Sequence, residues 1–169
     1  MGVNVHQYWK REPDGRTTYR KFWVEGDAVR MREGIAGEPG VIHERPRDPA
    51  LSAFDDLEAE VERMIMDNDD DWEDYCICEL VRVAIPLVLE SGHRTEEELD
   101  RVADKVGQTL DSLGVGNCDG IIFLGDLATL ECFVVDTAVA KREIRRVLAE
   151  AGWMEGVSVL LEGSDQEAL

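Results

Sequence analysis

The chain has 169 residues, of which 44% are hydrophobic, and its 37 Asp and Glu against 18 Lys and Arg give a net charge of −19. This apolar fraction excludes wholesale disorder, and the lack of any run of about 18 apolar residues excludes a membrane-spanning helix. The first ten residues lack the basic-then-apolar pattern of a secretion signal, so we expect a cytoplasmic protein.

The negative charge is unevenly distributed along the chain. Residues 1–47 hold nine Lys and Arg against seven Asp and Glu, a net of +2, whereas residues 48–169 hold nine against thirty, a net of −21. A surface this acidic repels the phosphates of nucleic acids and attracts basic proteins. The alternative is that the acidity only aids solubility or reflects a salt-adapted host.

Residues 1–74 predict a small antiparallel sheet followed by one helix. Short aromatic or alternating segments indicate strands at 6–10, 20–24, 28–32 and 41–42, and Pro13-Asp14-Gly15 is a turn signal between the first two. The segment Arg45–Pro49 is expected to break regular structure. A helix is then predicted from Phe54 to Asp67, with Ser52 as its N-cap. Its apolar face comprises Phe54, Leu57, Val61, Met64 and Ile65, and its other face is almost wholly acidic.

Residues 75–169 predict a second module, so the expected fold is α+β with domains at 1–74 and 75–169. An apolar strand over 77–89 precedes a helix whose start is marked by a capping box between Thr95 and Glu98. Further strands are expected at 120–125, 129–135 and 157–161, and a second helix at 138–151. The order β-α-β-β-α-β is that of a ferredoxin-like antiparallel sheet backed by two helices. Because Pro86 cannot donate a ladder hydrogen bond, we expect a bulge at Pro86 or the strand to end by residue 85.

The first module, over about residues 3–75, resembles the WGR domain of poly-ADP-ribose polymerases and small bacterial proteins. The resemblance rests on Lys21-Phe22-Trp23, on Gly26-Asp27-Ala28-Val29, and on the glycines of Glu33-Gly34-Ile35-Ala36-Gly37-Glu38-Pro39-Gly40. It implies a sheet and a helix, and in the polymerases such domains contact DNA and neighbouring domains. Glu33 and Ile35 stand where the family has its Trp and Arg, so DNA is not the expected partner, since phosphate contacts need Lys or Arg.

Metal and cofactor binding are not predicted. The acidic run that starts at Asp67 resembles a calcium loop, but Trp72 and Cys78 occupy the positions that need Gly and Glu. The four cysteines, Cys76, Cys78, Cys118 and Cys132, show no C-x-x-C spacing, so we expect buried thiols rather than a zinc site or disulfides.

Three histidines, His6, His43 and His93, are candidates for acid–base chemistry, whereas nothing in the sequence makes Asp126 and Glu131 an acid–base pair. No Ser or Cys nucleophile accompanies them in a recognisable motif, and no catalytic residues are predicted. An enzyme with a site in a cleft between the modules remains an alternative, which a deep pocket holding one of these histidines beside a carboxylate would favour.

The leading hypothesis is a non-enzymatic interaction protein that binds a basic partner, for example as an immunity or antitoxin-like inhibitor of a nuclease. The partner-binding residues are expected on the acidic helix face and in the run that follows it. They are Asp55, Asp56, Glu58, Glu60, Glu62, Asp67, Asp69, Asp70, Asp71, Trp72, Glu73 and Asp74. Trp72 is expected either to anchor in a pocket of the partner or to pack between the modules.

The alternative function is that of a degenerate WGR-type module that binds nucleic acid or serves as a scaffold. It would use a basic face formed by the cationic residues of the first module. These are Arg16, Arg20, Lys21, Arg30 and Arg32.

Overall fold

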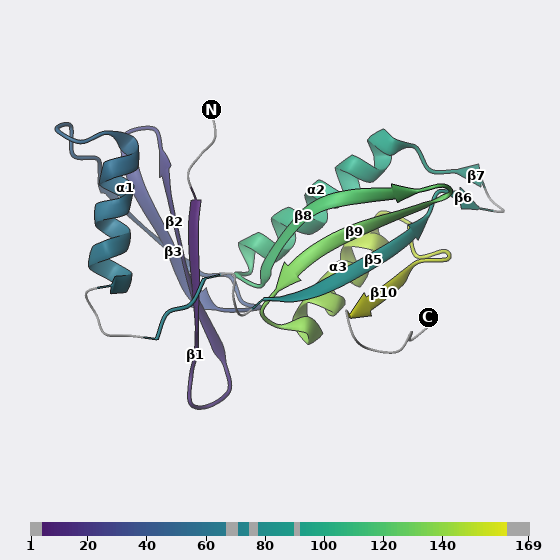
Figure 1. Cartoon of the computed structure of the whole chain (residues 1–169), viewed down its shortest axis with the longest axis horizontal. Coiled ribbons are helices and arrows are strands. Elements are labelled where there is room, and N and C mark those ends of the chain that lie inside the picture. Colours follow the sequence, from purple (N-terminus) through teal and green to yellow (C-terminus); the bar gives the residue numbers. More distant parts are fainter. Residues whose placement is uncertain (1–4, 67–70, 75–77, 90–91, 162–169) are drawn as a thin grey trace. The chain divides into compact units, whose positions relative to one another are not determined.

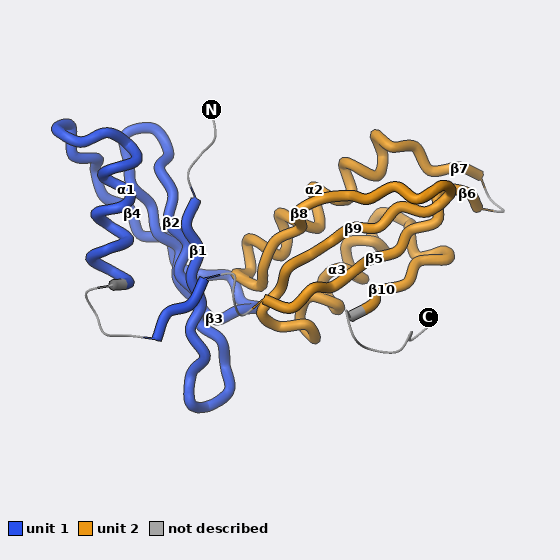
Figure 2. Tube along the Cα trace, viewed as in Figure 1, with its two compact units in different colours: residues 1–77 blue, residues 78–169 orange. Residues whose placement is uncertain are grey.

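The computed structural model describes residues 5–66, 71–74, 78–89 and 92–161, and the chain is α+β, as predicted. It divides into two compact units, residues 1–77 and 78–169 (Figure 1, Figure 2). The sequence placed the boundary between residues 74 and 75. No helix that the structure describes is long and apolar enough to cross a membrane.

The first unit is a four-stranded antiparallel sheet with one helix on it (Figure 1). The strands follow one another in chain order and are β1 (Val5–Arg11), β2 (Thr17–Glu25), β3 (Ala28–Ile35) and β4 (Val41–Pro46). The prediction that regular structure breaks from Arg45 onwards is wrong for Arg45 and Pro46, because both residues pair with β3. Pro46 is tolerated there because β4 is an edge strand and ends at this residue.

The helix of the first unit changes its hydrogen-bonding pattern near its end. Helix α1 (Ala53–Val61) begins at the N-cap Ser52, whose side chain accepts the backbone N–H of Asp55. It continues as a π-helical turn, η1 (Glu62–Met66). Its apolar face packs on the sheet through a core of Phe22, Val29, Met31, Leu57, Val61 and Ile65. Phe54, which the helical spacing assigned to this face, is 51% exposed.

The second unit has the predicted ferredoxin-like topology. Its strands are β5 (Glu79–Pro86), β8 (Gly116–Leu124), β9 (Leu127–Val134) and β10 (Ser158–Leu161), and its helices are α2 (Glu96–Ser112) and α3 (Thr137–Glu150). The sheet order is β10-β5-β9-β8, with every neighbouring pair antiparallel. Strand β5 includes Pro86, which pairs with Leu127, and ends there, one residue later than predicted. A short hairpin, β6 (Val88–Leu89) and β7 (Gly92–His93), precedes α2.

The core of the second unit lies between this sheet and the two helices, which cover the same face of it (Figure 1). The capping box predicted from Thr95 and Glu98 is present at the start of α2. Alternate residues of β5 and β9 point into the core beneath the helices. They are Val81, Val83, Ile85, Ala128, Leu130, Cys132 and Val134, all 0% exposed.

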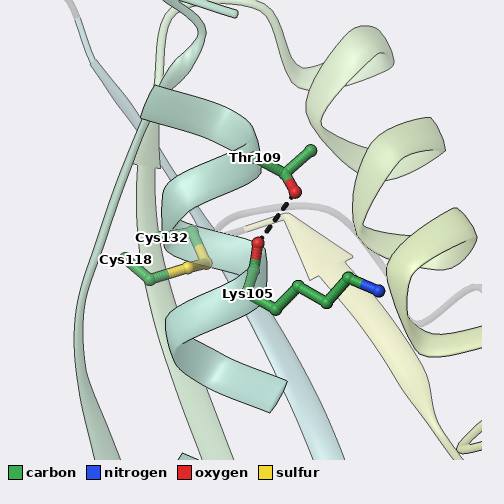
Figure 3. Close-up of a disulfide and its surroundings, with 4 residues drawn as sticks. All are labelled: Lys105, Thr109, Cys118 and Cys132. Atoms are coloured by element: carbon green, nitrogen blue, oxygen red, sulfur yellow. Dashed lines mark hydrogen bonds between the residues drawn. A yellow bond between two sulfur atoms is a disulfide. The ribbon is translucent and has the colours of Figure 1, made fainter. Parts of the chain in front are cut away.

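A disulfide joins Cys118 of β8 to Cys132 of β9 beneath helix α2, beside Lys105 and Thr109 (Figure 3). The expectation of thiols is therefore wrong for these two cysteines. The reason is a β-bulge: the ladder skips Asp119, so Cys118 lies directly opposite Cys132. Without that skipped residue, the register from the hairpin turn would pair Cys118 with Phe133. Cys76 lies outside the described residues.

Reducing this disulfide is expected to lower the free energy of unfolding of the second unit by about 3 kcal/mol, because it closes a loop of 14 residues in the unfolded chain. Hydrogen exchange of β5 and β9 amides at increasing urea, with and without a phosphine reductant, measures the loss for this unit alone. Cys118→Ala/Cys132→Ala should remove the sensitivity to the reductant, and Cys78→Ala should keep it. Equal stability of the oxidised and reduced protein would contradict the prediction.

Candidate interaction surfaces

Two of the five acidic residues predicted to face a partner from the helix are buried. Asp56 is 2% exposed and Glu60 is 8% exposed. Arg45 of β4 lies between them, with its Nη2 2.8 Å from Asp56 Oδ1 and its Nε 2.8 Å from Glu60 Oε2. Asp56 also accepts the backbone N–H of Asp48 at 2.8 Å. The prediction that all five face solvent is therefore wrong for Asp56 and Glu60, which tie α1 to β4.

The ion pairs also set the pKa values of these carboxyls. The hydrogen bond from Arg45 lowers the pKa of Asp56, outweighing the burial that would raise it. Burial would likewise raise the pKa of Glu60, but hydrogen bonds from Arg63 and Arg45 lower it. Both carboxylates are therefore anionic and are paired with Arg45 inside the first unit, so they are not presented to a partner.

Of the other three helix carboxylates, Asp55 and Glu62 are exposed and Glu58 is half-buried. Asp55 accepts the hydroxyl of Ser52 at 2.7 Å, which holds it at the start of α1. Glu58 lies one turn further on, with Oε1 2.8 Å from His6 Nε2 of β1. Glu62 stands in the exposed part of the π-helical turn.

The acidic segment after the helix is bound to the sheet edge. The backbone N–H and C=O of Glu73 bond to the C=O and N–H of Trp9 in β1, with N···O distances of 2.8 and 2.7 Å. Asp71, Glu73 and Asp74 are exposed beside this bridge. Asp67, Asp69 and Asp70, also predicted to bind the partner, lie outside the described residues.

Tyr8 connects the helix carboxylates to the segment carboxylates. It lies on the helix-covered face of β1 and packs edge-on against Phe22, with ring centroids 6.5 Å apart. Its pKa is raised, first by burial and then by the negative charges of Glu58 and Asp74. Two carboxylates from separate parts of the predicted site thus lie close enough to one hydroxyl to act on it. We call Tyr8, Glu58 and Asp74 the Tyr8 cluster.

Trp72 packs against the core of the first unit and does not project from the surface as an anchor. It is half-buried and packs against the apolar cluster beneath α1. The guanidinium of Arg20 lies 4.7 Å from the centre of its ring and donates to the backbone C=O of Met64 at 2.7 Å. Arg20 thereby joins β2, the end of the helix and the segment that holds Trp72.

The loop that carries the WGR resemblance depends on its glycines. A Cβ on Gly34 would lie 3.0 Å from the Cα of Gly40 and 3.2 Å from the ring of Tyr19, and one on Gly40 would lie 2.6 Å from the backbone oxygen of Glu33. Gly37 has a φ of +94°, which favours glycine. Each glycine of the pattern therefore has a steric reason to be there.

The cationic residues of the first module are largely engaged within the chain. Arg16 pairs with Asp14, Arg20 with Glu33, and Arg30 with both Glu25 and Glu44. The guanidinium of Arg32 lies 5.7 Å from the centre of the Trp23 ring. A phosphate would have to displace these partners from the three ion-paired arginines.

One histidine lies beside a carboxylate in a cavity. His43 Nε2 is 3.2 Å from Glu33 Oε1, and both line a cavity of about 360 Å³ between β3, β4 and the end of the helix. The cavity belongs to the first unit, whereas the sequence hypothesis put an enzymatic site between the modules. Its described lining includes no Ser, Thr or Cys. Across the described residues, no three His, Cys, Asp or Glu are grouped as a metal ion would require.

A groove in the second unit, between α2 and β8, was not predicted from the sequence. The available signal was the run Ile121-Ile122-Phe123-Leu124. Four consecutive apolar residues cannot all face the core of a sheet that is covered on one side only. Strand β8 is at the edge of its sheet, and Ile122, Phe123 and Leu124 are exposed.

No family model, no curated protein and no solved structure matches this chain.

Proposed function

We propose that the protein is a cytoplasmic, non-enzymatic binding module whose first unit takes a basic protein partner at the Tyr8 cluster. The observation that carries the proposal is that both acidic segments meet β1 next to Tyr8: Glu58 Oε1 lies 2.8 Å from His6 Nε2, and Glu73, beside Asp74, bridges to Trp9. Asp55, Glu62, Asp71 and Glu73 are exposed near these positions in the chain and would extend the negative surface. An immunity-type inhibitor that covers the basic cleft of a nuclease is one form of this function.

Charge and rigidity both support the proposal. Residues 1–77 carry ten Lys and Arg against nineteen Asp and Glu, a net of −9. A field of this sign steers a basic partner during encounter. Glu58 stands on a helix, and Asp74 follows a backbone bridge to β1, so little conformational entropy is lost when they meet the partner. Tyr8 adds a half-buried aromatic ring, a residue type enriched among binding hot spots.

Reversing the two charges of the cluster, as Glu58→Lys/Asp74→Lys, is expected to weaken binding of a basic partner about tenfold or more. The partner is a basic protein captured from the host on the immobilised chain, then purified, with pancreatic ribonuclease as a second basic probe. Affinity is measured by calorimetry at about 50 and 300 mM salt, because loss of charge contacts should also flatten the salt dependence.

Asp27→Lys/Glu38→Lys is the matched control, since it makes the same change in net charge at two exposed loop positions of the same unit. It should leave the affinity within about twofold. Equal losses in both double variants would mean that only overall charge matters, and no loss in the cluster variant would remove the cluster from the interface. Either result overturns the proposal.

The first unit is also proposed to be a degenerate WGR domain, which the steric need for Gly34, Gly37 and Gly40 supports. The position of the family's Trp is taken by Glu33, which pairs with Arg20 and His43. A carboxylate held at that position favours a protein partner over DNA. Titrating the chain with a DNA duplex at about 50 mM salt tests the nucleic-acid alternative, because phosphate-driven binding is strongest there.

The His43–Glu33 pair favours an enzymatic alternative. A neutral imidazole oriented by a carboxylate can accept a proton from water, and Arg30 and Arg45 line the same cavity. Hydrolysis of bis(p-nitrophenyl) phosphate by the purified chain, abolished by His43→Ala, would replace the binding proposal with this one.

A further inference from the structure

A groove with an acidic rim and an apolar floor runs between helix α2 and strand β8 in the second unit. It has a volume of about 640 Å³. Asp100 and Asp104 line it from the helix, and Asp119 lines it from the strand, while Ile121 and Phe123 supply apolar surface. No Lys or Arg is among the described residues that line it. The two cations on this part of α2 are engaged elsewhere, Arg101 with Glu97 and Lys105 with Glu150 of α3.

One side of the groove is the open edge of a sheet. Strand β8 pairs with β9 alone among the described strands, so its other edge presents backbone N–H and C=O groups without a ladder partner. Ile122 and Phe123 are each 44% exposed, and Leu124 is 67% exposed. The bulge at Asp119 interrupts the edge near its start, but Gly120 to Leu124 stay in register with β9. Proteins usually guard an apolar edge with Lys or Pro, and this stretch contains neither.

We propose that this groove binds an extended, basic segment of a partner protein, which adds to β8 as a further strand. Main-chain hydrogen bonds to an open sheet edge supply affinity in such complexes, and side chains at alternate positions supply specificity. One set of alternate side chains would face α2 and its carboxylates. The other set would face the uncovered side of the sheet, where Ile122 and Leu124 pair with Thr129 and Leu127.

The spacing of the carboxylates fits a strand. Asp100 and Asp104 are four residues apart on α2, which places them about 6 Å apart along the helix axis. Residues i and i+2 of a strand are about 6.7 Å apart and point to the same side. Two Lys or Arg at alternate positions can therefore each face one aspartate. The expected ligand pattern is a basic residue alternating with an apolar one.

Charge selects a basic segment rather than a second copy of this chain. Residues 78–169 carry eight Lys and Arg against eighteen Asp and Glu, a net of −10. Pairing β8 with the β8 of another copy would bring two acidic groove rims towards one another, and like charges facing one another oppose association. A basic strand would neutralise them.

This inference is independent of the proposed function, because the groove and the Tyr8 cluster belong to different units. The probe is a fluorescein-labelled, end-capped peptide of eight alternating Lys and Val residues, titrated with the full chain by fluorescence anisotropy at about 100 mM salt. Two control peptides accompany it: one of alternating Glu and Val, and the Lys–Val peptide with every second backbone nitrogen methylated.

Asp100→Asn/Asp104→Asn is expected to weaken binding of the Lys–Val peptide about tenfold. Asp27→Asn/Glu38→Gln removes the same charge from two exposed loop positions of the first unit and should leave binding within about twofold. The methylated and the Glu–Val peptides should not bind measurably, because the first cannot complete the strand ladder and the second is repelled. Unchanged melting temperatures confirm that the variants are folded.

Three results would overturn the inference. The first is equal binding of the methylated peptide, which leaves only charge attraction. The second is equal loss in both double variants. The third is a dimer in sedimentation that dissociates on Leu124→Lys, which would assign the edge to a second copy. Loss of partner binding in Glu58→Lys/Asp74→Lys with peptide binding intact separates the two surfaces.

Discussion

Replacing Arg45 with Met is expected to lower the free energy of unfolding of the first unit by about 3 kcal/mol. Its guanidinium is the partner of Asp56, which is 2% exposed, and of Glu60. Removing one partner of a buried pair leaves the other charge without compensation, which costs about 3–5 kcal/mol. The lower end applies because the Arg45 side chain is itself 35% exposed, so water reaches part of the site.

The loss is measured by urea unfolding followed by tryptophan fluorescence in a Trp153→Phe background, so that the signal comes from Trp9, Trp23 and Trp72 of the first unit. Arg63→Met is the matched control. Arg63 also pairs with Glu60, but its side chain is 62% exposed, so the loss should stay near about 0.5 kcal/mol. Adding Asp56→Asn to Arg45→Met should recover about 1 kcal/mol, because the uncompensated charge is gone. Equal effects of Arg45→Met and Arg63→Met would contradict the buried role of Arg45.

The same network predicts how stability depends on pH. The folded-state pKa values of Asp56 and Glu60 lie below those of the unfolded chain. Their contribution is therefore fully present above about pH 4.5 and is lost as the pH falls through the folded-state values. Arg45→Met should raise the pKa of Asp56. On acidification, the variant protein should therefore lose stability at a higher pH than the natural chain does. The difference between the two proteins should be largest near pH 7 and smallest below about pH 3.

The elements were predictable wherever a local pattern determined them. The capping box at Thr95 located the start of α2 at the correct residue, and the helical spacing of Leu57, Val61 and Ile65 identified the face of α1 that is buried. The order of strands and helices then left the ferredoxin-like sheet as the expected arrangement. Pro86 indicated the end of β5 because a proline cannot donate to the ladder.

The features that failed depend on contacts between distant parts of the chain. Asp56 and Glu60 look like exposed carboxylates in any helical projection, and only the approach of Arg45 from β4 buries them. In the sequence, Trp72 is surrounded by acidic residues and has no apparent packing partner. In the structure, the bridge between Glu73 and Trp9 holds its segment against β1, and Arg20 lies over its ring. The disulfide depends on a β-bulge at Asp119, and no sequence motif indicates that bulge.

Substituting Gly116 with Ala is expected to lower the free energy of unfolding of the second unit by about 4 kcal/mol. Gly116 begins β8 with a φ of +154°, and a side chain in such backbone costs about 1–3 kcal/mol. A Cβ would also overlap the carbonyl oxygen of Phe133 and lie 2.8 Å from the Cα of Val134. Overpacking against backbone that cannot rotate away adds about 1–3 kcal/mol.

Gly120→Ala is the matched control for this effect, since Gly120 is in the same strand and a Cβ there would meet nothing within 4 Å. Its effect should stay within about 0.5 kcal/mol. Hydrogen exchange of β5 and β9 amides at increasing urea measures both variants. Because Gly116 lets β8 lie close against β9, its replacement should shift β8 outward and so weaken binding of the Lys–Val peptide even where the chain is folded. A Gly116→Ala protein as stable as the Gly120→Ala protein would mean that β8 can leave its place on β9 at little cost, and the open edge would then not be a fixed template for a partner strand.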